Sequence, residues 1–470
     1  MKKAELIFVP APRIGHLVSI LEFTKRQIDS DDRLSITILC SKIQSLPLTD
    51  TYPKTVLASQ PRNRIQLIDL PEIDPPPLEL LKKSPQNYLR VFLESLIPNV
   101  KATIHTILSS HSNSNSTRVV GLVLDFFCVS MIDLGNELGI PSYMFQTTNA
   151  GFLDLMLYLS TDHDETSIVF NESDPALSIP GFVNPVPQSV LPTALFSNDG
   201  GYTTYIKLAK RYRDIKGIIV NSFSELETYA IGSINGHVPT VYAVGPLIDF
   251  KGPPHPNLDQ AHQDNIMKWL DDQSPSSVVF LCFGSLGSFG PSQVREIALG
   301  IQGSGCRFLW AMRMSPSKET PQNMLPEGFL EWMKDKGMIC EWAPQVEVLD
   351  HKAIGGFVSH CGWNSILESL WFGVPIVTWP MYAEQHLNAF MMVKELGLAV
   401  ELRLDYRMGV DLVMADEIEK AVKHLMDFDC EVRKKVKETG EMARKAVLRG
   451  GSSFNAIGQL IEDVIGSSCC

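Results

Sequence analysis

Residues 357 to 365 read FVSHCGWNS, and the pattern within them changes from that of a strand to that of a helix. The preceding run GGFVS is short and apolar, as strands buried on both faces are. The run SILESLWFG, residues 365 to 373, has helical periodicity and ends at a glycine followed by Pro375. A glycine-containing turn therefore joins a strand directly to a helix, as in open α/β domains.

The same alternation runs along the whole chain, with amphipathic stretches such as HLVSILEFTKRQI between short apolar runs. Such alternation is typical of parallel sheets covered by helices. The strand-like runs are ELIFV (5–9), LSITILC (34–40), IQLIDL (65–70), VVGLVLD (119–125), PSYMF (141–145), GIIVN (217–221), SVVFLCFGS (277–285), RFLWAMR (307–313), GMICEW (337–342), GGFVSH (355–360) and PIVTWP (375–380).

The chain is long enough for two domains, since 470 residues exceed what one ordinary core holds. The stretch VGPLIDFKGPPHPNLDQ, which begins at Val244, is rich in proline and glycine and lacks periodicity, as linkers do. We expect an α/β protein of two Rossmann-like domains that face each other across a cleft. The expected segments are a first domain at 1–244, a linker at 245–262, a second domain at 263–452, and a C-terminal helix and tail at 453–470 that pack back on the first domain.

Composition excludes several classes of protein. The net charge of −12 disfavours a nucleic-acid-binding surface. No apolar stretch approaches the roughly 20 residues that span a bilayer, and no signal peptide is recognised at the start. The nine cysteines are scattered without CxxC spacing, which indicates reduced thiols. We therefore expect a cytoplasmic protein, a monomer, that neither inserts into membranes nor binds nucleic acid.

The residues after the strand at 355–359 allow three kinds of chemistry. Neighbouring side chains of a strand point to opposite faces, so His360 and Cys361 should not form a base and nucleophile pair. A metal site would need further ligands at suitable spacing, which are missing. An anion site is consistent with the turn, because a helix N-terminus offers free N–H groups to which Asn364 and Ser365 add donors. A helix cap beside a core histidine would explain the same residues.

A longer match favours the anion site. Residues 342 to 385 read WAPQVEVLDHKAIGGFVSHCGWNSILESLWFGVPIVTWPMYAEQ, which closely resembles the signature box of plant UDP-dependent glycosyltransferases of family 1 that act on small molecules. Weaker resemblance covers FGSLGSF at 283–289, VLDFF at 123–127 and the PxxGH-like start. The resemblance implies the GT-B fold, with an N-terminal domain for the acceptor and a C-terminal domain for the UDP-sugar.

The resemblance also assigns the residues that bind the donor. Trp342 would stack on uracil, with Gln345 and the backbone of Ala343 at the edge of the base, and Glu368 would accept hydrogen bonds from the ribose hydroxyls. The diphosphate would be held by Ser285, His360, Asn364 and Ser365, and the sugar by Trp363, Glu384 and Gln385. In this family, glutamine at the closing position of the box goes with glucose, so Gln385 favours UDP-glucose as donor substrate.

Glycosyl transfer to a hydroxyl needs a base, and His16 suits this role. It follows the first strand and lies near the start of a helix, where the dipole disfavours protonation. Asp125 ends another strand and could hold the imidazole through its other nitrogen. The catalytic histidine and aspartate of the family map onto these two residues. Direct displacement with one base should invert the anomeric centre and give a β-O-glucoside.

We expect neither a metal nor a cofactor. Metal-dependent glycosyltransferases of another fold carry an Asp-x-Asp motif, and such triplets begin here at Asp29, Asp162 and Asp427. All three lie in polar surroundings instead of at the end of an apolar strand, so solvated loops or helix ends explain them better. The helix N-terminus and His360 can stabilise the leaving diphosphate without a metal.

The acceptor is expected to be a small hydrophobic plant metabolite of flavonoid, other phenolic or triterpenoid type. Large apolar side chains suit such molecules, although each could instead belong to a core. Arg13 replaces a glycine that is frequent in relatives and lies in the loop that borders the acceptor. The candidates for acceptor contacts are Ile14, Phe126, Phe145, Thr147 and Phe196.

Three other functions remain as alternatives. A nicotinamide-dependent oxidoreductase would need GxGxxG after a first strand, which PAPRIGH and GSLGSFG do not supply. The same fold could use another UDP-sugar, or could bind nucleotide-sugars or small molecules without catalysis. The presence of both His16 and Asp125 favours catalysis.

Overall fold

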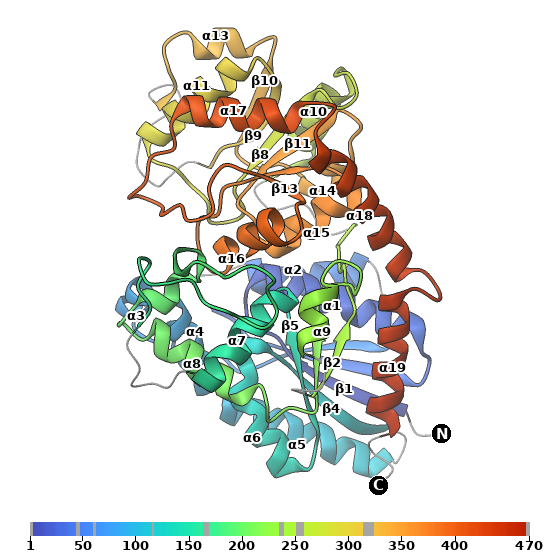
Figure 1. The fold of residues 1–470 in the computed structure, drawn as a ribbon. Coiled ribbons are helices and arrows are strands. Elements are labelled where there is room, and N and C mark those ends of the chain that lie inside the picture. Colours follow the sequence, from blue (N-terminus) through green and yellow to red (C-terminus); the bar gives the residue numbers. More distant parts are fainter. Residues whose placement is uncertain are drawn as a thin grey trace. The chain divides into compact units, whose positions relative to one another are not determined.

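The chain folds into two compact α/β units, shown in the computed structural model of Figure 1. Unit 1 comprises Met1–Val186, Ala194–Pro253 and Lys445–Cys470, and unit 2 comprises Pro187–Thr193 and Pro254–Arg444. The residues that the structure describes are 3–43, 48–59, 63–114, 117–162, 169–234, 239–250, 258–313 and 324–466.

Unit 1 is built on a parallel sheet of seven strands within the described residues, in the order β3-β2-β1-β4-β5-β6-β7. Chain order reverses between β1 and β4, which pair directly with Phe8 opposite Val123 and Val9 opposite Leu124. Ligand sites of open parallel sheets lie where strand order reverses, outside the carboxyl ends. The strands are β1 (Lys3–Val9), β2 (Leu34–Cys40), β3 (Ile65–Asp69), β4 (Thr117–Asp125), β5 (Ser142–Gln146), β6 (Gly217–Val220) and β7 (Thr240–Ala243).

Helices cover this sheet, and the last helix of the chain is one of them. Helix α19 (Ser452–Gly466) buries Ile457, Leu460, Ile461 and Val464 in the same apolar cluster as the strands. The other helical elements of unit 1 are α1 (Ile14–Ser30), α2 (Leu48–Ser59), α3 (Leu78–Lys83), α4 (Pro85–Ser95), α5 (Ile97–Ser114), η1 (Phe126–Met131), α6 (Ile132–Leu138), α7 (Ala150–Asp162), α8 (Gly201–Arg211) and α9 (Thr228–Ile234), with η3 (Thr193–Phe196) at the boundary.

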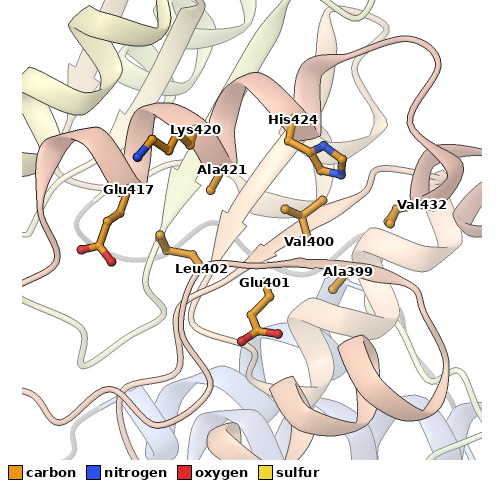
Figure 2. A pocket seen from close by; sticks show the side chains of 9 residues that line it. All are labelled: Ala399, Val400, Glu401, Leu402, Glu417, Lys420, Ala421, His424 and Val432. Atoms are coloured by element: carbon orange, nitrogen blue, oxygen red, sulfur yellow. The ribbon is translucent and has the colours of Figure 1, made fainter.

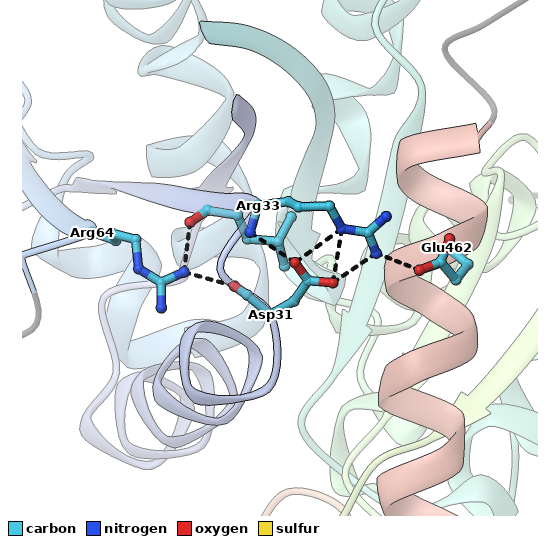
Figure 3. A network of polar contacts seen from close by, with 5 residues as sticks. Asp31, Arg33, Arg64 and Glu462 are labelled. Atoms are coloured by element: carbon cyan, nitrogen blue, oxygen red, sulfur yellow. Dashed lines mark hydrogen bonds and ion pairs between the residues drawn. The ribbon is translucent and has the colours of Figure 1, made fainter. Parts of the chain in front are cut away.

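A polar network fastens α19 to the turn between α1 and β2 (Figure 3). Arg33 pairs with Asp31 at 2.7 Å and also with Glu462 of α19. Arg64 donates to the backbone oxygen of Asp31 at 2.6 Å and to that of Leu34 at 3.0 Å. Because the side chains of Arg33 and Glu462 are well exposed, their ion pair adds little stability and mainly fixes the position of the helix end.

Unit 2 repeats the plan with a parallel sheet of six strands among the described residues, in the order β10-β9-β8-β11-β12-β13. Strand order reverses between β8 and β11. The strands are β8 (Val278–Cys282), β9 (Arg307–Ala311), β10 (Gly337–Cys340), β11 (Ile354–Ser359), β12 (Ile376–Thr378) and β13 (Ala399–Glu401). The helical elements are η2 (Gln188–Val190), α10 (Gln260–Asp271), α11 (Pro291–Ser304), α13 (Phe329–Met333), α14 (Gln345–Asp350), α15 (Trp363–Phe372), α16 (Gln385–Phe390), the π-helix η4 (Met391–Glu395), α17 (Ala415–Met426) and α18 (Glu431–Val447), the last of which crosses the boundary.

The expected linker at 245–262 differs from the structure at its beginning. Leu247 and Ile248 are 1% exposed, and the backbone N–H of Leu247 donates to the side-chain oxygen of Asn221 at 3.0 Å. This part of the proline-rich stretch therefore belongs to the core of unit 1, while residues 251–257 lie outside the described residues. Unit 1 also resumes at Lys445, earlier than the expected position 453.

A buried carboxyl group in unit 1 links α7 to α9. Asp154 is 4% exposed, and its Oδ1 accepts a hydrogen bond from Ser233 at 3.0 Å. Its Oδ2 is buried without a partner among the described residues, and a Cβ atom on Gly181 would come within 1.8 Å of it. Burial, together with the nearby charge of Glu227, raises the pKa of Asp154 to about 8. The folded protein therefore holds this carboxyl group protonated below that pH.

We predict that Asp154→Asn reduces the loss of stability that accompanies a rise in pH from about 5 to about 8. A folded-state pKa above the unfolded value means that the stability from this group is lost as pH rises toward the folded pKa, with a slope of at most about 1.4 kcal/mol per pH unit. The neutral amide removes this dependence. Urea unfolding between about pH 5 and pH 8 should show midpoints that fall less steeply than those of the wild type. Asp199→Asn, at an exposed position, serves as control. The same dependence of the urea midpoint on pH in the wild type, Asp154→Asn and Asp199→Asn would contradict the prediction.

Candidate active site

In unit 1, His16 and Asp125 form a hydrogen-bonded pair where β1 and β4 end. His16 lies in the first turn of α1, and Asp125 is the last residue of β4. The Nδ1 atom of His16 is 2.7 Å from Oδ2 of Asp125. The side chain of Asp125 is fully buried, whereas that of His16 is 16% exposed. The structure thus brings together the two residues that the sequence predicted as a base and its orienting carboxylate.

The contacts of this pair determine which nitrogen of His16 can act as a base. Oδ1 of Asp125 accepts the backbone N–H of Phe127 at 3.0 Å, which fixes the carboxylate. The imidazole stacks on Phe126 and Phe127, with ring centroids 5.4 and 5.9 Å away. Because a carboxylate accepts the Nδ1–H, the lone pair of the neutral ring is on Nε2. His16 therefore presents Nε2 as a proton acceptor.

A row of buried aromatic side chains in contact with one another extends from His16 into unit 1. Phe126 meets Phe152 edge to face at 6.0 Å, and Phe152 meets Tyr205 in the same way at 6.1 Å. Phe152 on α7 and Tyr205 on α8 were not identified from the sequence. Their helices pack together, and only the folded chain places them beside the strand ends. A signal was present in the apolar character of α7, but it does not distinguish a binding surface from a core.

The other candidates for acceptor contacts occupy different environments. Ile14 is half-buried in the first turn of α1, and Phe196 is half-buried at the end of η3. Thr147 follows β5 and is 5% exposed, with its hydroxyl unpaired among the described residues. Phe145 is fully buried and packs against Phe23 at 5.4 Å, because alternate residues of β5 face the α1 side of the sheet. Phe145 is therefore a core residue, and we omit it from the proposed acceptor site.

In unit 2, Gln345 connects the helices that follow β10 and β11. Its Nε2 donates to Oγ of Ser365 at 2.8 Å and to Oε2 of Glu368 at 2.6 Å. Trp342 and Ala343 lie just before α14, in the segment that leaves β10. Ser365 and Glu368 are close together because both belong to α15, one turn apart. This network fixes one oxygen of the Glu368 carboxylate beside α14.

The turn at His360 differs from the sequence interpretation in one respect. Strand β11 ends at Ser359, so His360 and Cys361 lie in the turn and not in the strand. Cys361 has a φ of 61°, and it is this left-handed backbone that separates the two side chains. Burial raises the pKa of the Cys361 thiol to about 12. The thiol is fully buried and stays protonated, which excludes it as a nucleophile.

His360 is enclosed by two glycines. A Cβ atom on Gly284 would come within 2.4 Å of its Nε2, and one on Gly362 within 2.6 Å. Both turns therefore need glycine to admit the imidazole. Burial, together with the charge of Arg313, lowers the pKa of His360 to about 4. The ring is neutral at physiological pH and offers one N–H donor beside the N-terminus of α15.

The last expected contacts surround the start of α16. Oε1 of Gln385 accepts the backbone N–H groups of Met381 and Tyr382, each at 3.0 Å. The amide NH₂ of Gln385 thus remains as a donor in a fixed orientation. Glu384 is half-buried at the N-cap position of α16, and Trp363 is 3% exposed at the start of α15. His386 is fully buried and donates to the backbone oxygen of Tyr406 at 2.7 Å, so it belongs to the core.

Arg313 lies among these residues, although the sequence did not identify it. It follows β9, and its guanidinium carbon is 3.4 Å from the ring centroid of Trp342. Its Nη1 donates to the backbone oxygen of Ser285, whose side chain is exposed in the turn after β8. The run RFLWAMR could have indicated this position, since Arg313 is polar and stands beyond the apolar part of a strand.

A groove elsewhere in unit 2 is lined by β13 and α17 and has a volume of about 520 Å³ (Figure 2). Its charged side chains are already paired, Glu401 with Lys394, Glu417 with Arg403, and Lys420 with Asp416. It therefore shows no open charge for a ligand. Within the described ranges, no group of three or more His, Cys, Asp or Glu residues is placed to hold a metal ion. No described helix combines the length and the apolar character needed to cross a bilayer.

We predict that His360 does not titrate near neutrality. Its folded-state pKa of about 4 lies below the usual value because protonation would place a charge in a buried site beside Arg313. In the protein labelled with ¹³C-histidine, the Cε1 signal that disappears in His360→Gln should stay at the neutral position down to about pH 5. The signal of the exposed His105, assigned with His105→Gln, is a control for the assignment. A midpoint for His360 between about pH 6 and pH 7 would contradict the account.

The chain is similar to known proteins in sequence and in fold. A family model described as UDP-glucoronosyl and UDP-glucosyl transferase matches residues 230–433. UDP-glycosyltransferase 71K1 of Malus domestica is 57% identical, with all of both chains aligned. The flavonol 3-O-glucosyltransferase UGT71C4 of Arabidopsis thaliana is 50% identical, also over the full length of both.

A solved structure extends the similarity to three dimensions. The crystal structure of Medicago truncatula UGT71G1 complexed with UDP-glucose matches with a TM-score of 0.90 and 59% identity, over 98% of each chain. This similarity confirms the GT-B fold expected from the sequence. The chain belongs to the family of plant UDP-dependent glycosyltransferases.

Proposed function

We propose that the protein transfers glucose from UDP-glucose to a hydroxyl of a small hydrophobic plant metabolite, with inversion at the anomeric carbon. The observation that carries this proposal is the hydrogen bond of 2.7 Å between His16 and Asp125, which leaves Nε2 of His16 as a base. A buried carboxylate that orients an imidazole is the arrangement a hydroxyl nucleophile needs.

The proposed reaction is one displacement. Nε2 of His16 takes the proton of the acceptor hydroxyl while its oxygen forms a bond to the anomeric carbon. The bond from that carbon to the diphosphate breaks at the same time, and UDP leaves with the electron pair. Asp125 stabilises the imidazolium that forms, because its carboxylate is already fixed by the N–H of Phe127. An α-linked donor then yields a β-O-glucoside.

The donor side of the proposal rests on unit 2. Trp342 offers a ring for uracil, with Gln345 and the backbone of Ala343 beside the base. Glu368 is assigned to the ribose hydroxyls, and the hydrogen bond from Gln345 holds its carboxylate in place. The relative from Medicago truncatula was crystallised with UDP-glucose, which supports the same donor here.

The leaving diphosphate would meet fixed donors. We assign to it the neutral His360, the hydroxyls of Ser285 and Ser365, and Asn364 in the first turn of α15. The N-terminus of that helix adds N–H groups and a favourable dipole. These groups can stabilise the charge that develops on UDP, so we propose a mechanism that needs neither a metal nor a cofactor.

The sugar would be held by Gln385, Glu384 and Trp363. Gln385 is suited to read hydroxyls because Met381 and Tyr382 fix its oxygen and thereby aim its NH₂ group. A buried amide left unpaired by a sugar with a different hydroxyl pattern would cost affinity. We therefore propose glucose as the preferred sugar.

The acceptor site is proposed to use Phe126 and Ile14, with Thr147 and Phe196 at its margin. Phe152 and Tyr205 are buried and pack behind Phe126. Flat aromatic side chains suit flavonoids and other phenols, and the name of the relative from Arabidopsis thaliana, a flavonol 3-O-glucosyltransferase, supports this class. Triterpenoids are the second class to be tested. None of the seven described cysteines forms a disulfide, which is consistent with our proposal of a cytosolic enzyme.

The experiment that tests this function is an assay with UDP-glucose against flavonol, simple phenol and triterpenoid acceptors, with products resolved by mass spectrometry. Parallel reactions with UDP-galactose and UDP-glucuronic acid test the sugar, and reactions with EDTA test the need for a metal. Glucoside formation that withstands EDTA is the expected result. Release of UDP only with another sugar would contradict the donor assignment.

We predict that His16→Ala loses transfer while keeping its fold and its affinity for UDP. Removal of a general base costs about 10²- to 10⁴-fold in rate, and the donor residues lie in the other unit of the chain. Turnover and UDP calorimetry on the same samples measure the two effects. The control is His105→Ala, an exposed histidine on α5. Near-normal turnover by His16→Ala would remove His16 as the base.

A further inference from the structure

Arg313 covers one face of the tryptophan that is proposed to bind uracil. Its guanidinium carbon lies 3.4 Å from the centroid of the Trp342 ring, which is a stacking distance for two planar groups. The strand order explains this contact, because β9 lies between β10, which leads to Trp342, and β8, which leads to Ser285. Arg313 therefore stands between the proposed sites for the base and for the diphosphate.

The guanidinium that covers this face of Trp342 also contacts the turn of Ser285, a proposed phosphate-binding residue. Nη1 of Arg313 donates to the backbone oxygen of Ser285. The charge of Arg313 also contributes to the low pKa of His360, so the two side chains are close in space. A base that stacks on this face of Trp342 and the guanidinium need the same volume. Uracil can bind there only if the guanidinium moves.

The electrostatics of Arg313 indicate where it can go. The side chain is half-buried, and burial lowers its pKa from the usual value. In the part of the chain that the structure describes, no carboxylate forms an ion pair with it. The charge of Glu341 acts on this cation, although no ion pair between the two is seen in the described residues. A poorly solvated guanidinium gains from a close anion, and a diphosphate accepts the two parallel hydrogen bonds that it donates.

We propose that Arg313 is a donor-site residue with two positions. In the empty site its guanidinium covers the ring of Trp342. When the donor binds, the guanidinium leaves the ring of Trp342, where uracil then stacks, and pairs with the diphosphate. This inference rests on the proposed function, since it takes a uridine diphosphate sugar as the ligand. Arg313 would then stabilise the leaving UDP as a cation, together with the neutral His360 and the N-terminus of α15.

The two positions have opposite effects on two ligands, which makes the proposal testable. Uridine has the base but no phosphate. It must therefore displace the guanidinium from Trp342 without forming an ion pair with it. UDP displaces it and then binds it. We expect Arg313→Ala to bind uridine about threefold to tenfold more tightly than the wild type, and UDP about tenfold or more weakly. Arg313→Lys keeps the charge but loses the two parallel hydrogen bonds, so its affinity for UDP should lie between those of the wild type and Arg313→Ala.

The experiment is calorimetry of uridine and UDP with the wild type, both Arg313 variants and the control Arg307→Ala. Arg307 is the first residue of β9, the strand that precedes Arg313. Its guanidinium donates to Gln273 and to the backbone oxygen of Asp335, so both affinities should be unchanged. A weakening of uridine and UDP by the same factor, or no change in either, overturns the role of Arg313. Turnover of UDP-glucose by the wild type is measured alongside. Its absence, together with absent UDP binding, overturns the proposed function and this inference with it.

Discussion

All strands of a parallel sheet end at the same edge, and the chemistry of both units depends on this constraint. In unit 1 the neighbouring strands β1 and β4 lead to His16 and Asp125. In unit 2 the ends of β8, β10 and β11 lead to Ser285, Trp342 and His360. These side chains are far apart in the sequence, but the buried strands before them fix where they lie. Function is thus placed by the most rigid part of each unit.

A second feature common to both units is that hydrogen bonds within the protein already hold the polar side chains of the proposed sites in place. Asp125 is held by the N–H of Phe127, Glu368 by Gln345, and Gln385 by two backbone N–H groups. In each case a hydrogen bond within the protein sets the orientation of a polar group that we propose to take part in chemistry or recognition. Such groups need little reorganisation when a ligand or a transition state arrives. Arg313 differs, because its present partner is the ring that a ligand would need.

Much of this organisation could be predicted from the sequence, because buried strands and strand-to-helix turns have strong local signals. All eleven strand-like runs contain a strand, whereas the edge strands β7 and β13 were missed, since they are short and less apolar. The dyad and the donor residues followed from motifs. What could not be predicted depends on tertiary packing. Three contacts between distant segments are examples. Phe145 packs on Phe23 in the core, Phe152 contacts Phe126, and Arg313 stacks on Trp342.

The central claim is that one base drives one displacement at the anomeric carbon. His16 is oriented for this by a single buried carboxylate, and no covalent glucosyl-enzyme intermediate is required. The configuration of the product records the number of displacements directly. The glucoside formed from UDP-α-glucose should be collected early and its anomeric proton examined by NMR. The account predicts the β-glucoside, with the large coupling of two axial protons. An α-glucoside would contradict it, because retention requires two displacements or a different path.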